Sequence, residues 1–122
     1  MAAMRELKIH VEDTGEFFRR AADLARRLDA GERELSEAHL SFDGLDLLLR
    51  TMTHNRWALL RSLRQRGASS IRALAAALGR DYKAVHSDVT ALIEAGLIER
   101  DQAGLISVPW SRISAELDLA AA

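Results

Sequence analysis

Apolar side chains recur at two different spacings in this sequence, and the spacing separates strands from helices. In "RELKIHVE", Leu7, Ile9 and Val11 alternate with polar residues, which predicts a half-buried strand. The segment "LSEAHLSF", residues 35–42, alternates in the same way and predicts a second strand. The intervening residues predict a helix to about residue 30, capped by Asp13 or Thr14 and ended by Gly31. Its apolar stripe, expected to pack inward, contains Phe17, Ala21, Leu24 and Leu28.

Residues 1–43 therefore form a predicted β-α-β arm, and such a crossover makes its two strands parallel. A two-stranded sheet is marginal alone and leaves its edges open. We expect the arm to pair with its copy in a second chain and so to form a homodimer. The alternative is that the arm packs on the rest of its own chain.

Helical spacing dominates the remainder of the sequence. Four helices are predicted, over residues 45–52, 54–66, 71–78 and about 81–95, the last three capped by Thr53, Ser70 and Asp81. "LIERDQAGLISV" predicts two short strands around a Gln102-Ala103-Gly104 turn. After Pro109, the spacing of Trp110, Ile113 and Leu117 predicts a short amphipathic helix. The expected fold class is α+β and mainly helical, divided into residues 1–43, 44–108 and 109–122.

Three helices followed by a hairpin is the element order of a winged helix-turn-helix. The segment "SIRALAAALGRDYKAVHSDVTALIEAGLIERD" resembles the winged-helix transcriptional regulators of bacteria and archaea, broadly of the MarR-like type. More narrowly, it is similar to a family of small predicted DNA-binding proteins, over about residues 53–110. The resemblance implies a regulator that binds double-stranded DNA. Members of that family often lie beside small toxin genes, so the resemblance also implies an antitoxin role as an alternative.

Charge is distributed in a way that suits this expectation. Residues 56–100 carry eight basic and four acidic side chains, whereas residues 1–55 carry eight and eleven, in a chain of net charge −1. A positive block between acidic flanks suggests one surface for a polyanion. An ordinary arginine-rich surface would give the same count.

The helix expected at about residues 81–95 provides the candidate DNA-reading face. Its apolar positions gather on one side. Lys83, Ser87 and Thr90 lie opposite, with Ala84 and Ala91 beside them and His86 on the flank. In a helix-turn-helix that outer face enters the major groove. Lys83 can reach guanine or a phosphate, and Ala84 suits a thymine methyl. The related family carries polar or basic residues where this chain has Ala84 and Ser87, which reduces the expected base discrimination.

Supporting contacts to DNA are expected from three further places. The start of the second helix of the motif offers Ser69, Ser70 and Arg72 to a phosphate. Arg80 lies in the turn, Arg100 enters the hairpin, and Gln102 at its tip is placed for the minor groove. For each arginine, a solvated charge is the competing interpretation.

Other functional classes find little support in the sequence. The chain contains no cysteine, and its four histidines stand in no metal-binding or catalytic spacing. We therefore expect no enzyme activity, no metal and no cofactor. The N-terminus lacks the apolar run of a signal peptide, and no segment suits a membrane span, so a cytoplasmic protein is expected.

The antitoxin alternative needs a surface for a small basic toxin. The acidic arm is one candidate, and the stripe of Trp110, Ile113 and Leu117 is another, because buried aromatic residues often dominate interfaces. The competing interpretation is that Trp110 packs on its own hairpin. No cluster of convergent polar residues indicates a small-molecule site, and the sequence does not exclude a site for an apolar ligand.

Overall fold

The computed structural model describes residues 5–31 and 37–117, which adopt an α+β fold. The chain divides into two compact units. Met1–Arg50 and Ser111–Ala122 form one, called the sheet unit, and Thr51–Trp110 form the other, called the helical unit.

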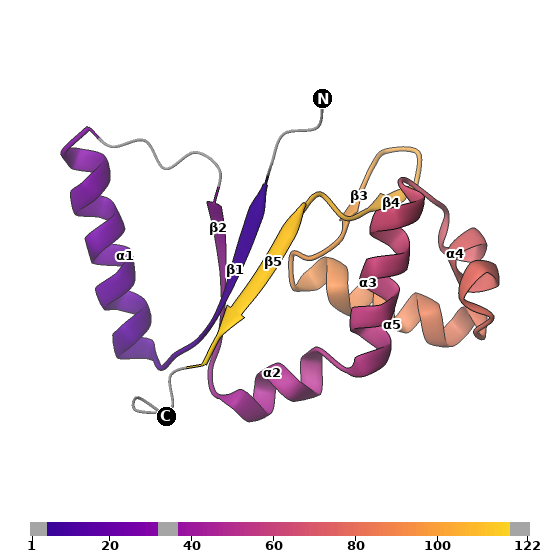
Figure 1. Ribbon diagram of the computed structural model, residues 1–122, viewed down its shortest axis with the longest axis horizontal. Coiled ribbons are helices and arrows are strands. Elements are labelled where there is room, and N and C mark those ends of the chain that lie inside the picture. Colours follow the sequence, from indigo (N-terminus) through magenta and orange to yellow (C-terminus); the bar gives the residue numbers. More distant parts are fainter. Residues whose placement is uncertain (1–4, 32–36, 118–122) are drawn as a thin grey trace. The chain divides into compact units, whose positions relative to one another are not determined.

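The sheet unit is built on three parallel strands, β1 (Glu6–Val11), β2 (Glu37–Phe42) and β5 (Arg112–Glu116). Their order is β2-β1-β5, so β1 lies in the middle (Figure 1). Ile9 on β1 lies opposite both Leu40 and Ala115. Strict alternation then collects the apolar residues on one face, where Leu7, Ile9 and Phe42 are buried. The two predicted strands and their parallel direction are confirmed.

The helix predicted after Pro109 is wrong, because residues 112–116 form a strand instead. Over eight residues, the spacing of Trp110, Ile113 and Leu117 fits a helix, but Ile113 and Ala115 also alternate with polar neighbours. The open edge of β1 decides between the two, since a strand there fills a row of backbone hydrogen-bonding groups. Ser111 adds a reciprocal pair of hydrogen bonds between its side chain and the backbone of Arg5.

Helix α1 (Thr14–Asp29) begins where predicted, because the Asp13 side chain accepts a hydrogen bond from the Glu16 amide at 2.8 Å. The expectation that its apolar stripe packs inward is wrong. No residue of α1 is buried. The sheet holds the helix by a polar contact instead, because the Arg20 guanidinium donates to Glu12 and Ser41.

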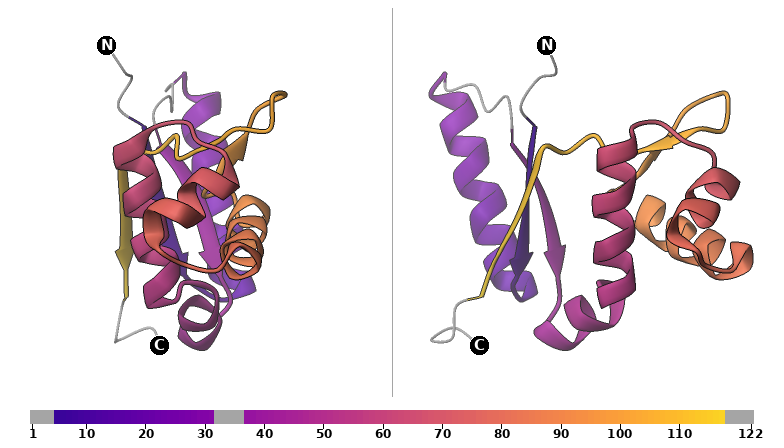
Figure 2. Two further views of the ribbon diagram at one scale, coloured as in Figure 1. Left: turned by 90° about the vertical axis from the view of Figure 1, so that its right-hand side faces the viewer. Right: turned by 45° about the vertical axis from the view of Figure 1, so that its right-hand side comes forward.

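The helical unit contains three capped helices and a hairpin. Helix α2 (Leu45–Thr51) leads into it, followed by α3 (His54–Arg66), α4 (Ile71–Leu78) and α5 (Tyr82–Glu94). Thr53, Ser70 and Asp81 cap the last three as predicted, each accepting a hydrogen bond from an amide of the first turn. The hairpin of β3 (Glu99–Arg100) and β4 (Ile106–Ser107) stands out from these helices (Figure 2).

Two glycines make the connections in this unit possible. Gly79, with φ of 65°, ends α4 in the left-handed conformation, which lets the chain turn directly into α5. Gly104, with φ of 86°, lies in the hairpin turn, where its amide donates to the Asp101 carbonyl. The predicted hairpin around Gly104 is thus confirmed.

The core of the helical unit is formed by residues of α3, α4 and α5 and of the hairpin region. Its most completely buried side chains are Leu59, Leu63, Leu74, Val85, Val89, Leu92, Leu97 and Ile106. Trp57 is only half-buried, whereas Leu59 and Leu63 are the most deeply buried residues of α3. Because Val85, Val89 and Leu92 hold one side of α5 in the core, the opposite side of that helix is fixed facing outward.

Candidate functional site

The outward side of α5 is a polar surface made of the residues that the sequence singled out. Lys83, Ala84, His86, Ser87 and Thr90 are all exposed. None of them is needed to fill the core, since the buried residues of α5 are Val85, Val89 and Leu92. We call these five exposed residues the α5 outer face.

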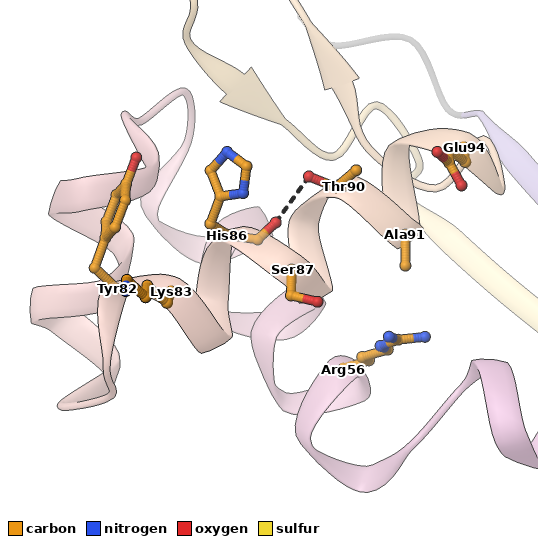
Figure 3. A pocket seen from close by; sticks show the side chains of 8 residues that line it. All are labelled: Arg56, Tyr82, Lys83, His86, Ser87, Thr90, Ala91 and Glu94. Carbon is orange, nitrogen blue, oxygen red and sulfur yellow. Dashed lines mark hydrogen bonds between the residues drawn. The ribbon is translucent and has the colours of Figure 1, made fainter.

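A shallow, open hollow of about 560 Å³ runs along this face (Figure 3). Residues of α5 from Tyr82 to Glu94 form most of it, and Arg56 of α3 lies across from Ser87 and Ala91. The hollow is therefore an elongated surface one helix long and not an enclosed cavity for a small molecule.

The hydroxyl groups of this face differ in what they can offer a ligand. Thr90 donates its proton to the backbone carbonyl of His86 at 2.9 Å, one turn earlier in the same helix (Figure 3). Its oxygen can still accept a hydrogen bond, but the hydroxyl is no longer a donor. Its methyl group and acceptor oxygen remain for a ligand.

Arg72 and Tyr82 connect the start of α4 with the start of α5. The guanidinium carbon of Arg72 lies 4.6 Å from the centre of the Tyr82 ring. The centre of the His86 ring, one turn later in α5, lies 5.8 Å from the centre of the Tyr82 ring. Tyr82 stays 38% exposed, so this cluster is part of the surface. Stacking on an aromatic ring restricts a long arginine side chain and holds its charge beside the α5 outer face.

Arg80 takes part in an ion triad that the sequence did not predict. Its Nη2 donates to Asp88 at 2.9 Å, and the other oxygen of that carboxylate accepts from Arg56 Nε at 3.1 Å. Arg56 also donates to the Thr51 carbonyl at 2.7 Å. The three side chains are 15–26% exposed. This ion triad joins α5 to α3 and to the turn before α5, so part of the Arg80 guanidinium is used within the fold, and its contact with DNA stays a prediction.

Ser69 is corrected, whereas Ser70 keeps its predicted position. The Ser69 backbone exchanges two hydrogen bonds with Ile106 of the hairpin, its hydroxyl donates to the Ser70 carbonyl, and the residue is 8% exposed. It therefore has no free amide for a phosphate. Ser70 is exposed and uses its hydroxyl oxygen to accept from the Ala73 amide as the helix cap.

The hairpin presents Arg100 and Gln102 at the surface, as expected. Arg100 is exposed on β3, and Gln102 is exposed in the turn that follows. Asp101 between them organises the turn, since its side chain accepts a hydrogen bond from the Leu105 amide at 2.9 Å. A hairpin fixed in this way can place both side chains reproducibly.

Trp110 does not belong to a docking stripe. It is only 9% exposed, and its indole Nε1 donates to the Gly96 carbonyl at 3.1 Å, so it closes the helical unit. Ile113 lies in the next unit on β5. The predicted helical stripe of Trp110, Ile113 and Leu117 is therefore wrong, because residues 112–116 form a strand and Trp110 is buried.

A separate polar cluster lies on the sheet. His10 and His39 stack at 5.0 Å and share a hydrogen bond of 2.8 Å between Nε2 and Nδ1. Burial, followed by the positive charge of Arg20, lowers the pKa of His10. The hydrogen bond from Arg20 holds the pKa of the Glu12 carboxyl below its usual value. Within the described residues, no group of three or more histidine, aspartate or glutamate side chains could hold a metal ion.

Sequence reasoning missed Asp88 and Arg56, which carry the ion triad. Asp88 lies eight residues after Arg80, at a spacing of about two helical turns, but the turn between α4 and α5 hides that relation. One signal was present in the sequence. Asp88 follows Val85 at i+3 and precedes Val89, so a charge was placed at the margin of the buried stripe, where it needs a partner.

Comparison with known proteins gives one family. No curated protein and no solved structure matches the chain. Among the described helices, none is both long and apolar enough to cross a membrane. A family model, HVO_A0114, matches residues 51–115, which is more than half of the 122 residues and includes the whole helical unit. The chain belongs to the HVO_A0114 family.

Proposed function

We propose that this protein is a winged helix-turn-helix regulator that binds double-stranded DNA as a homodimer. In this proposal α4 and α5 are the helix-turn-helix, α5 is the recognition helix, and the β3–β4 hairpin is the wing. The observation that carries the proposal is the α5 outer face. It is fixed outward by the buried Val85, Val89 and Leu92 and is polar where the fold requires nothing polar.

The size of this surface suits a nucleic acid groove. Helix α5 has 13 residues, about 20 Å at 1.5 Å per residue, and a helix fits the major groove of B-DNA by its width. Lys83 lies in the first turn, and in a helix-turn-helix the N-terminal half of the recognition helix lies nearest the base edges. Lys83 is therefore the residue expected to approach guanine or a backbone phosphate.

The distribution of charge supports the same partner once the ion triad is taken into account. Asp88 neutralises part of the charge on Arg56 and Arg80, so the basic side chains that remain on the surface are the ones available to phosphate. Exposed basic residues lie at the start of α4, on α5 and on the hairpin: Arg72, Lys83 and Arg100. Three elements that follow each other in the chain thus each offer one cation, which is the arrangement expected for contacts with successive phosphates.

The chemistry of the face predicts modest base discrimination. Ser87 can donate and accept, but Thr90 can only accept and Ala84 offers only a methyl group. Such a face distinguishes a few base pairs at most. In a homodimer that spans two half-sites, the preference of each copy for its half-site multiplies with that of the other. The proposed function therefore includes the second copy.

Fluorescence anisotropy tests the proposal with the purified protein. The labelled DNA is the segment upstream of the gene, and a scrambled duplex of the same length and composition is the control. We expect tighter binding to the upstream DNA and an affinity that falls steeply as salt is raised, because phosphate contacts release counterions. Equal affinities for the two duplexes, with little dependence on salt, would contradict a sequence-specific regulator.

A further inference from the structure

Helix α1 exposes the apolar side that a helix of its kind normally buries. Phe17 is 42% exposed, Phe18 is 63% exposed and Leu28 is 49% exposed. Exposed apolar residues are common singly, but these three lie on one side of one helix. Within the described part of the sheet unit, nothing packs on this side closely enough to bury any residue of α1.

The contacts of α1 with its own sheet explain why the apolar side stays outside. Arg20 donates to Glu12 at 2.7 Å and to Ser41 at 2.9 Å, and Ser41 also donates to the same carboxylate at 2.6 Å. The residues of α1 that are partly covered are Glu16, Arg20 and Leu24, one turn apart along the helix. The side of α1 that carries Glu16 and Arg20 therefore faces the sheet, and Leu24 lies at its boundary. At 100° per residue, the centre of the apolar side points about 70° away from the direction of Arg20.

The spacing of the residues on the apolar side is the same in both directions along the helix. Phe17, Ala21, Leu24 and Leu28 are separated by four, three and four positions. If two copies of α1 cross antiparallel about a two-fold axis, Phe17 meets Leu28 of the second copy, and Ala21 meets Leu24. A small residue opposite a larger one at the centre lets the two helices approach closely.

The charges at the two ends of α1 favour the same arrangement. Glu16 lies in the first turn and Arg27 lies in the last turn, and both are on the same flank of the apolar side, whereas Arg26 lies on the opposite side and pairs with Asp23 at 3.4 Å. Antiparallel pairing brings the acidic end of one helix to the basic end of the other, and it also opposes the two helix dipoles favourably. Parallel pairing would place the basic ends together. The helix is thus complementary to a second copy of itself in one orientation.

We propose that the apolar side of α1 is the homodimer interface of this protein, formed by antiparallel pairing of α1 from two copies. This inference deepens the homodimer of the proposed function and rests on it, but it does not depend on DNA binding. It is an alternative to the expectation that strand edges join the two copies: β5 occupies the second edge of β1, although β2 and β5 keep their own outer edges.

The absence of cysteine from the sequence allows a direct test by cross-linking. Phe17→Cys and Leu28→Cys are prepared in separate full-length proteins, mixed, allowed to exchange subunits and mildly oxidised. Residues 17 and 28 are about 16 Å apart along the helix, whereas a disulfide needs Cα atoms within about 7 Å. We expect a cross-linked dimer in the mixture and almost none with either protein alone. A cross-link with Phe17→Cys alone would mean parallel pairing and would overturn the proposal.

Sedimentation without DNA provides the second measurement. Leu28→Arg should weaken the dimer at least roughly tenfold, because the substitution acts twice in a symmetric interface. Arg19→Ala, on the opposite side of the same helix, should leave the dimer unchanged. Since both positions are exposed, thermal unfolding should confirm that both variants are folded. A dimer that survives Leu28→Arg, or a native protein that sediments as a monomer at micromolar concentration, would overturn the assignment.

The two proposals fail separately in these experiments. Leu28→Arg should still bind DNA that carries one half-site, because the α5 outer face is untouched. Loss of the dimer with retained half-site binding supports both proposals. A dimer that cross-links as expected but binds no DNA would support the α1 interface and contradict the proposed DNA-binding function.

Discussion

Arg80 and Asp88 form an ion pair of 2.9 Å that joins the turn before α5 to the middle of that helix. Arg56 binds the other oxygen of the same carboxylate from α3. One carboxylate thus sets the position of α5 relative to its two preceding helices. The orientation of the α5 outer face depends on this contact as well as on the buried apolar residues.

Removal of that carboxylate should destabilise the protein. Asp88→Ala leaves two partly buried guanidinium groups without their counterion, at an expected cost of roughly 2–4 kcal/mol in the free energy of unfolding. Urea unfolding followed by circular dichroism measures the loss. Glu94→Ala is the matched control, because Glu94 is an exposed acid on the same helix. An equal, small effect of both substitutions would mean that the ion triad contributes little.

Lys83 should matter for DNA and not for folding. Lys83→Ala removes an exposed cation from the first turn of α5, so we expect roughly tenfold weaker binding to the upstream DNA and an unchanged melting temperature. Arg19→Ala removes one charge from the other unit and controls for net charge alone. If the two variants lose affinity equally, Lys83 makes no direct contact.

Ser87 and Thr90 should respond differently to loss of their hydroxyl groups. Thr90→Val keeps the shape of the side chain, and the proton it removes is already used within the helix. We expect less than a twofold change in DNA affinity for Thr90→Val and a larger loss for Ser87→Ala, whose hydroxyl can donate. Anisotropy titrations of both variants against the same duplex compare them. The reverse order would place Thr90, through its acceptor oxygen, closer to the bases than Ser87.

Acid should weaken the sheet unit first through His10. The pKa of folded His10 is below its ordinary value of 6.5, so the unfolded chain takes up the proton first as the pH falls. The stability contributed by neutral His10 is complete above about pH 6.5 and is lost below it. His10→Gln should therefore reduce the drop in melting temperature between about pH 7.5 and about pH 5.5. His54→Gln, at the exposed start of α3, should leave that drop unchanged.

Glu12 should act at lower pH and in the same direction. Its folded pKa lies below the ordinary value of 4.5, so its contribution is complete above about pH 4.5 and is lost as the pH falls through the folded value. Glu12→Gln should make the stability less sensitive to pH below about 4.5, at the expense of a lower stability near neutrality. Guanidinium unfolding of Glu12→Gln and of the native protein across that range measures the difference in stability.

Local signals in the sequence predicted most elements of the fold. Caps such as Thr53, Ser70 and Asp81 act within one helical turn, so they are visible without tertiary information. The strand at residues 112–116 was not predictable in this way. Its conformation depends on β1, more than a hundred positions earlier, and short apolar spacings fit a helix and a strand equally well.

The candidate site divides along the same line. The five residues of the α5 outer face follow from helical geometry alone, and all five are exposed as predicted. Whether an individual arginine is a surface charge or part of an ion pair depends on contacts between helices. Arg80 and Arg72 looked equivalent in the sequence, yet one is bound to Asp88 and the other is stacked on Tyr82 at the surface.

Strand β5 links the segment that matches the family to strand β1 of the sheet unit. The segment that matches the HVO_A0114 family ends at residue 115, inside β5, but the strand that β5 pairs with lies near the start of the chain. A fragment of residues 51–115 would thus end in a strand with both edges unpaired, which favours local unfolding or aggregation. Transfer of residues 51–115 to another chain would therefore require a strand that takes the place of β1 beside β5.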